Sequence, residues 1–157
     1  MLIGACGLNW DATVYEWNKS AGRRILGQRS VGRGKVEVAD FSGSRCIYVL
    51  YKGADIYYVG LSTSYGLLSG RLSDHLKDRH AELWDQFSWF SFDAPSEEVD
   101  EDGVLILDDD WDFYDKLTAN EAIKDLEAIL IALLAPSGNR RNEKFAAGEK
   151  WTQVIKP

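Results

Sequence analysis

The chain has 157 residues, 45% of them hydrophobic, and a formal net charge of −7 at pH 7. This length and apolar content fit one domain that buries a core without disulfides, and the isolated thiols Cys6 and Cys46 indicate neither a disulfide framework nor a zinc site. No run approaches the roughly 18 to 20 apolar residues that span a bilayer, and no basic stretch precedes an apolar run at the N-terminus, so the sequence predicts a cytoplasmic protein with no membrane partner.

A basic segment precedes the first strongly apolar strands. Residues 19–35 hold six basic and four glycine residues and no acidic one. This composition is typical of a mobile or hairpin-like arm. The arm is either a solvated loop or a contact for nucleic-acid phosphates, and in the second case Arg29, Arg33 and Lys35 are the expected contacts.

Two short segments rich in β-branched and aromatic residues predict a hairpin. They cover residues 46–51 and 56–60, with a Lys-Gly-Ala-Asp connection between them. Tyr48 and Tyr58 lie an even number of residues apart, so they share a face only if the connection keeps an odd register through an odd loop or a bulge, for example with Tyr51 opposite Tyr57. Taken alone, tyrosines in strands are ordinarily packing residues.

A helix and a third strand are predicted next. In residues 65–79, Leu68, Leu72 and Leu76 recur every four residues on one side, while Arg71 and His75 lie on the polar side. Residues 87–92 are predicted to form a strand that is buried on at least one face.

The acidity of the chain is concentrated in residues 93–115, which contain 11 acidic residues and no basic one, with a short strand expected at residues 104–107. Outside this segment the chain has 18 basic and 14 acidic residues. Such a run is most often a solvated loop, and the alternative is a regulatory or partner-binding segment. The net charge therefore does not exclude a nucleic-acid partner.

A second helix is predicted from a capping box at Thr118 and Glu121 to about Ala135. Its expected solvent face carries the side chains of Glu121, Lys124, Asp125, Ala128 and Ala132. On this wheel Glu127 emerges among apolar residues instead. A desolvated carboxylate needs a partner, which is either a buried ion pair with Arg or Lys or a bound metal.

The order of these elements predicts an α/β (α+β) fold, a small three-stranded and mainly antiparallel sheet flanked by helices. Because the first hairpin must be antiparallel, a doubly wound parallel sheet is not expected. The predicted organisation is an N-terminal extension over residues 1–44, a domain over residues 45–144 with the acidic insertion at 93–115, and a C-terminal tail over residues 145–157.

The order and spacing of several residues resemble the GIY-YIG nuclease family. The matching elements, which span about residues 45–144, are Cys46-Ile47-Tyr48, Tyr58-Val59-Gly60, Arg71 with His75 one turn later, Glu127 on a helix, and Asn139 after Pro136. Two positions depart from the pattern. Cys46 replaces the first glycine of the signature, and Leu61 stands where the excision-repair branch often has a lysine.

The resemblance implies a metal-dependent DNA endonuclease in restriction or defence, repair or mobile-element biology. It assigns catalytic roles to Tyr48, Tyr58, Arg71, His75, Glu127 and Asn139. It places Mg²⁺ or Mn²⁺ on the Glu127 carboxylate, which would account for the apolar surroundings expected there. Tyr48 is the preferred general base and His75 the alternative. Arg71 would offset charge on the phosphoryl oxygens.

Other functions and partners stay open at this level. Arg140 and Arg141 follow Asn139 and are expected either to contact phosphates or only to solvate the surface. RNA is an alternative substrate to DNA. A homodimer or a partner subunit is expected to supply target recognition. A different class of function is a catalytically silent binding or regulatory module that acts through the acidic segment.

Overall fold

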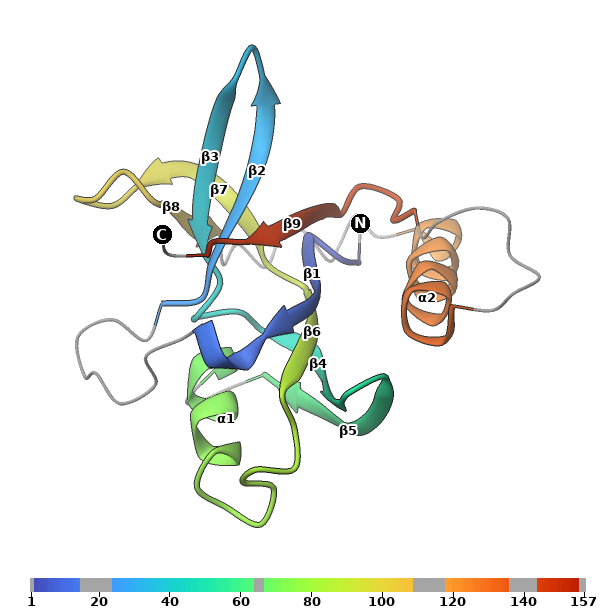
Figure 1. Cartoon of the computed structure of the whole chain (residues 1–157). Helices are drawn as coiled ribbons and strands as arrows, with labels where there is room; N and C mark the ends of the chain where they lie inside the picture. Colours follow the sequence, from blue (N-terminus) through green and yellow to red (C-terminus); the bar gives the residue numbers. More distant parts are fainter. Residues whose placement is uncertain (1, 15–23, 64–66, 109–117, 136–143, 156–157) are drawn as a thin grey trace.

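The computed structural model describes residues 2–14, 24–63, 67–108, 118–135 and 144–155. In this part of the chain, nine strands form one sheet with two α-helices and a short 3-10 helix beside it (Figure 1). The strands are β1 (Ala5–Asp11), β2 (Leu26–Gly32), β3 (Lys35–Asp40), β4 (Cys46–Lys52), β5 (Asp55–Ser62), β6 (Gln86–Ser91), β7 (Ala94–Val99), β8 (Leu105–Asp108) and β9 (Glu149–Gln153). The helices are η1 (Ala12–Val14), α1 (Leu67–His75) and α2 (Ala119–Leu134).

The predicted fold class is wrong. The strands follow the order β5-β4-β6-β1-β9-β2-β3-β8-β7 in a mixed, curled sheet that resembles a half-barrel, rather than in a small three-stranded sheet flanked by helices. The β1–β9 and β3–β8 pairs are parallel, and the other pairs are antiparallel. The error arose because the segments before residue 45 and after residue 144 supply strands to the same sheet.

These outer segments hold the centre of the sheet together. β1 pairs with β6 on one side and with β9 on the other, so residues near both ends of the chain lie side by side in the sheet. Segments on both sides of residues 45 and 144 therefore belong to one hydrogen-bonded sheet.

Several predicted elements are present. β4, β5 and β6 correspond to the three predicted strands, α1 is a shortened form of the predicted first helix, and β8 corresponds to the short strand in the acidic segment. The capping box at Thr118 and Glu121 opens α2 as predicted. The basic arm forms the β2–β3 hairpin in residues 26–40, while residues 19–23 lie outside the described part of the chain.

The β4–β5 hairpin contains the bulge that the two tyrosines require. Tyr58 lies opposite Leu50, whereas Tyr51 lies opposite Ile56, so the register shifts between Leu50 and Tyr51. Because residues 48 and 50 of β4 project to the same face, Tyr48 and Tyr58 share that face. The shared face is confirmed, although Tyr51 does not lie opposite Tyr57.

The two faces of β4 and β6 carry separate apolar cores. One core contains Tyr48, Leu50 and Trp89 together with Leu68 and Leu72 of α1. The other contains residues of β4 and β6 from the opposite face together with two residues of α2; these residues are Val49, Tyr51, Phe90, Ala128 and Ile129. The two helices therefore cover opposite faces of this part of the sheet.

α2 faces the sheet with part of the side that was predicted to face solvent, since Asp125 and Ala128 are buried while Lys124 is exposed. Asp125 is fully buried, and its carboxylate accepts hydrogen bonds from the backbone N–H groups of Leu2 and Ile3 at 2.9 Å and of Ala146 at 2.7 Å. Glu127 is exposed. Backbone groups from two distant segments, which the helical wheel does not include, supply the partners that decide the rotation of α2.

The leucine-rich side of α2 consequently lies at the surface. The exposed fractions of Leu126, Leu130 and Leu134 are 53%, 57% and 63%. Among the described residues, no helix has the length and apolar character needed to cross a membrane. The thiols of Cys6 and Cys46 are both buried.

Candidate functional site

The centre of the candidate site is Tyr48 on β4, whose ring lies across the backbone of Gly60 on β5. A Cβ atom at residue 60 would lie 2.3 Å from the Tyr48 hydroxyl oxygen, which is far below a van der Waals contact. Glycine at this position therefore makes room for the phenol. The Gly60 of the Tyr-Val-Gly motif thus has a local structural reason that does not depend on any family resemblance.

Three side chains form a hydrogen-bonded chain that starts at this phenol. The Tyr48 hydroxyl lies 2.9 Å from His75 Nε2, and His75 Nδ1 lies 2.9 Å from Asp78 Oδ2. Because a carboxylate only accepts, Nδ1 of the imidazole donates to Asp78. In the neutral ring Nε2 is then the acceptor, and the Tyr48 hydroxyl donates to it.

A second tyrosine–histidine pair supports the first. The Tyr57 hydroxyl lies 2.9 Å from His80 Nδ1, and the Arg79 guanidinium donates to His80 Nε2 at 3.3 Å. The His80 backbone N–H donates to Asp78 Oδ1 at 2.7 Å, so both carboxylate oxygens of Asp78 are used. These bonds fix the turn after α1 and hold Asp78 against His75.

Tyr58 packs against both histidines. Its ring centroid lies 5.0 Å from that of His75, 4.8 Å from that of His80 and 6.2 Å from that of Tyr48. Tyr48 and His75 are buried, whereas Tyr58 is only partly buried and Arg71 is exposed. A bound molecule would therefore meet Tyr58 and Arg71 before it meets the buried Tyr48 and His75, while Asp78 lies at the surface.

The surroundings shift the pKa values of Tyr48 and Asp78. Burial raises the pKa of the Tyr48 hydroxyl above its usual range, and Tyr58 adds to the rise, while the Arg71 guanidinium opposes it. Desolvation raises the pKa of Asp78, but hydrogen bonds from the His80 backbone and from the His75 ring outweigh it, so the pKa lies below its usual value. Tyr48 is therefore protonated at neutral pH and Asp78 is ionised.

The structure brings some of the predicted site residues together and separates one. Tyr48, Tyr58 and His75 are in mutual contact, and Arg71 is close enough to influence the charge state of Tyr48. Glu127 is on α2, which packs on the opposite face of β4. The predicted residues Asn139, Arg140 and Arg141 lie outside the described residues.

The three predicted phosphate contacts in the basic arm differ in their surroundings. Arg29 forms ion pairs with Glu37 and Glu149, and its guanidinium carbon lies 4.8 Å from the centre of the Trp151 ring. The guanidinium of Arg29 therefore already has partners within the protein. Arg33 and Lys35 are exposed at the end of the β2–β3 hairpin.

Sequence reasoning missed Asp78, His80 and Tyr57. The His75-x-x-Asp78 spacing is a usable signal, because residues three apart meet on a helix or in the turn that ends it. His80 gave no such signal, since its contact with Tyr57 depends on the path of the chain after α1.

The metal placement implied by the resemblance does not fit this geometry. The Glu127 carboxylate is exposed on α2 and does not share the face that carries Tyr48. Among the described residues, the group with metal-ligand chemistry is His75, Asp78 and His80, whose ligand atoms lie within 4.8 Å of one another. Every ring nitrogen in that group already has a hydrogen-bonding partner, so the group is satisfied without an ion.

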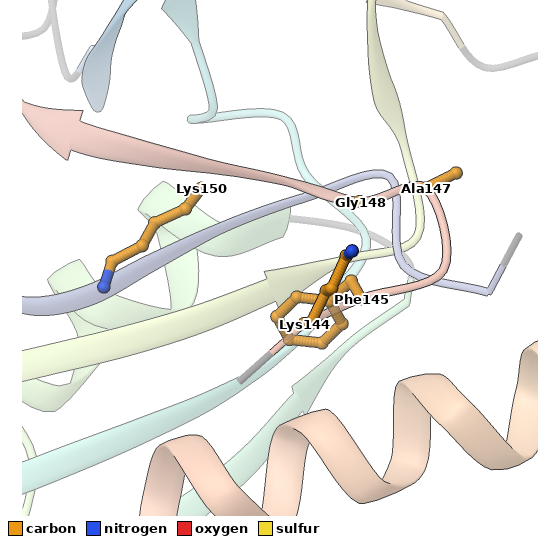
Figure 2. Close-up of a pocket in the computed structure, with 5 residues that line it drawn as sticks. All are labelled: Lys144, Phe145, Ala147, Gly148 and Lys150. Atoms are coloured by element: carbon orange, nitrogen blue, oxygen red, sulfur yellow. The ribbon is translucent and has the colours of Figure 1, made fainter. Parts of the chain in front are cut away.

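A shallow pocket lies elsewhere, beside the start of β9. Figure 2 shows the ammonium groups of its lining residues Lys144 and Lys150 apart from each other, so the two cations do not converge on one point. The remaining lining residues are Phe145, Ala147 and Gly148. This surface offers a bound anion no enclosed polar group.

In comparisons with known proteins, no family model, curated protein or solved structure gave a significant match to this chain. The resemblance to the GIY-YIG nucleases consequently rests on the residues named above.

Proposed function

We propose that this protein is an endonuclease that hydrolyses phosphodiester bonds in DNA. The observation that supports it most is the hydrogen-bonded chain of Asp78, His75 and Tyr48 next to Tyr58 and Arg71. A buried tyrosine that donates to a carboxylate-oriented histidine is a proton-transfer arrangement, and the exposed Arg71 supplies a cation beside it.

In the proposed step the hydrogen-bonded side chains of Tyr48, His75 and Asp78 act together. A water molecule held by Tyr58 attacks phosphorus and gives its proton to the Tyr48 oxygen, while the Tyr48 proton passes to His75 Nε2. The phosphorus–oxygen bond to the leaving sugar breaks, and that oxygen takes a proton from solvent. Asp78 stabilises the imidazolium, and Arg71 stabilises the added charge on the phosphoryl oxygens.

This relay removes an obstacle to tyrosine acting as a base. A phenol with a raised pKa is a poor base if it must first ionise at neutral pH. In the relay Tyr48 never carries a full charge, because it releases one proton as it receives another. His75 is the final acceptor, and so the two candidates for general base act in series.

The cellular setting and the metal are independent of this chemistry. We place the protein in the cytoplasm, where the thiols of Cys6 and Cys46 stay reduced. Mg²⁺ or Mn²⁺ is the cofactor that the resemblance implies. Dimerisation or a partner subunit is proposed for cutting both strands.

The test is a cleavage assay on duplex DNA, single-stranded DNA and RNA, with Mg²⁺ or with a chelator. The Tyr48→Phe variant should cleave DNA about 100-fold or more slowly than wild type. Tyr51→Phe, which removes a hydroxyl from the same strand on the opposite face, is the control and should cleave at a near-normal rate. Equal rates for wild type and Tyr48→Phe would refute the proposed chemistry.

A further variant tests whether the Glu127 carboxylate takes part in cleavage. If Glu127→Ala cleaves DNA as wild type does, the Glu127 carboxylate has no part in the reaction. If that variant loses cleavage while its fold is intact, the carboxylate at residue 127 belongs to the catalytic site. Absence of cleavage by wild type on every substrate, together with a salt-sensitive complex with a basic protein, would favour the silent binding module.

A further inference from the structure

The β2–β3 hairpin projects from the rest of the sheet as a two-stranded ribbon (Figure 1). At its base, β2 pairs with β9 through Gly27 and Gln28, and β3 pairs with β8 at Ala39. Beyond these points the described strands give the ribbon no third neighbour. The turn contains Gly32 and Gly34 at φ of 91° and 75°, conformations that glycine adopts without strain.

A ribbon of this kind is unusual on a free surface. Two strands alone are marginally stable in water, and exposed strand edges favour unwanted pairing with other chains. Val31 and Val36 on this ribbon are exposed by 44% and 57%, so it also carries apolar surface into solvent. These features are more readily explained if the ribbon has a binding partner.

The charges at the two ends of the hairpin differ. At the base, Arg24 pairs with Asp40, Asp100 and Asp102, and the Arg29 contacts described above occupy that side chain in the same way. At the tip, neither Arg33 nor Lys35 has a hydrogen bond or ion pair to another side chain in the described part of the chain. Two available cations therefore stand at the end of a projection from a protein whose net charge is −7.

We propose that the tip of this hairpin, residues 31–36, inserts into the major groove of double-stranded DNA and reads its sequence. This inference rests on the proposed function, which makes DNA the substrate. The major groove is about 12 Å wide and admits a two-stranded ribbon. Arg33 is suited to a guanine edge, Lys35 to a phosphate, and Val31 and Val36 to thymine methyl groups.

The composition of the tip favours duplex DNA over other nucleic acids. Proteins that bind single strands stack bases on aromatic side chains, and residues 31–36 contain none. The major groove of duplex RNA is too deep and narrow for side chains to read. The acidic β7–β8 hairpin beside the base of β3 carries the exposed Glu97, Glu98 and Glu101, and it would repel a duplex from the base and leave the tip as the approach.

The test measures binding of a labelled DNA duplex by fluorescence anisotropy across a salt series. The Arg33→Ala/Lys35→Ala double variant should bind at least about tenfold more weakly, and the slope of log affinity against log salt should fall by about one. Lys124→Ala/Lys144→Ala removes the same charge from exposed positions elsewhere and is the matched control. The Val31→Ser/Val36→Ser variant should keep the salt slope and lose preference between duplex sequences.

Several outcomes would overturn the inference. They are an equal loss of affinity in the tip and control variants, unchanged binding in the tip variant, or competition by single-stranded DNA or RNA as effective as by duplex. Because binding is measured without cleavage, an active enzyme with tip-independent binding refutes only the groove contact. Tip-dependent duplex binding by a protein that never cleaves refutes only the nuclease reaction.

Discussion

The region around β4, β5 and α1 and the region around α2 both carry residues that the sequence marked for catalysis, but the fold treats them differently. In the first region Tyr48, Tyr58 and His75 come together. In the second, Asp125 is buried and Glu127 is exposed, the reverse of the prediction. Strand register fixes neighbours over short distances, whereas the rotation of a helix depends on what covers it.

The largest expected effect comes from substituting the two carboxylates on α2 one at a time. Asp125→Ala leaves three backbone N–H groups without their acceptor and should lower the free energy of unfolding by about 3 kcal/mol. Glu127→Ala, two residues away, should change it by less than about 0.5 kcal/mol. Denaturant unfolding measures both. A larger loss for Glu127→Ala than for Asp125→Ala would mean that α2 is rotated so that Glu127, and not Asp125, faces the sheet.

A smaller effect is expected at the glycine beneath Tyr48. Gly60→Ala forces the phenol away from its position and should lower the free energy of unfolding by about 2 kcal/mol. It should also slow DNA cleavage by about tenfold or more through misplacement of the hydroxyl. Gly70→Ala in α1 is the control, because a Cβ there meets no atom within 4 Å and alanine favours the helix. Normal cleavage by Gly60→Ala would argue against the position assigned to Tyr48.

Asp78 is expected to act by positioning His75 rather than by contacting substrate. Asp78→Asn keeps the shape of the side chain but no longer favours the tautomer with a proton on Nδ1, so cleavage should slow by about tenfold. The rate-against-pH profile should also shift, which a purely structural role would not cause. If Asp78→Asn has the wild-type rate and pH profile, Asp78 does not take part in the proposed proton transfer.

The smallest expected effect is the alkaline stability of the protein. Because burial raises the pKa of Tyr48 in the folded state, its contribution to stability is complete below the unfolded value of about 10 and is lost as the pH rises toward the folded value. Wild type should therefore lose more stability than Tyr48→Phe between about pH 9 and about pH 11. Unfolding in denaturant at these pH values measures the difference, and parallel losses would contradict the burial of this hydroxyl.

Local patterns predicted much of the secondary structure but not the sheet. The β4–β5 hairpin and the capping box of α2 follow from residues close in sequence, such as Thr118 and Glu121. The pairing of β1 with β9 joins Ala5 to Glu149, and no local pattern specifies that contact. The orientation of α2 likewise depends on hydrogen bonds between Asp125 and Leu2, 123 residues apart.

The candidate site follows the same division. The spacing of Tyr48 and Tyr58 required either an odd loop or a bulge if these two residues were to share a face, and the structure has a bulge. The partnership of His75 with Asp78 arises in the turn after α1, where the predicted helix stops earlier than expected. Helical periodicity predicts which face of a helix a residue lies on, but it does not predict which side chains will form a hydrogen bond.

The most direct test of the proposed relay is a double-mutant cycle on DNA cleavage with Tyr48→Phe, His75→Gln and the combined variant. If the two side chains transfer one proton in series, the combined variant should be no slower than the slower single variant, because either change breaks the same chain. Losses that multiply, or a normal rate in either single variant, would contradict the relay.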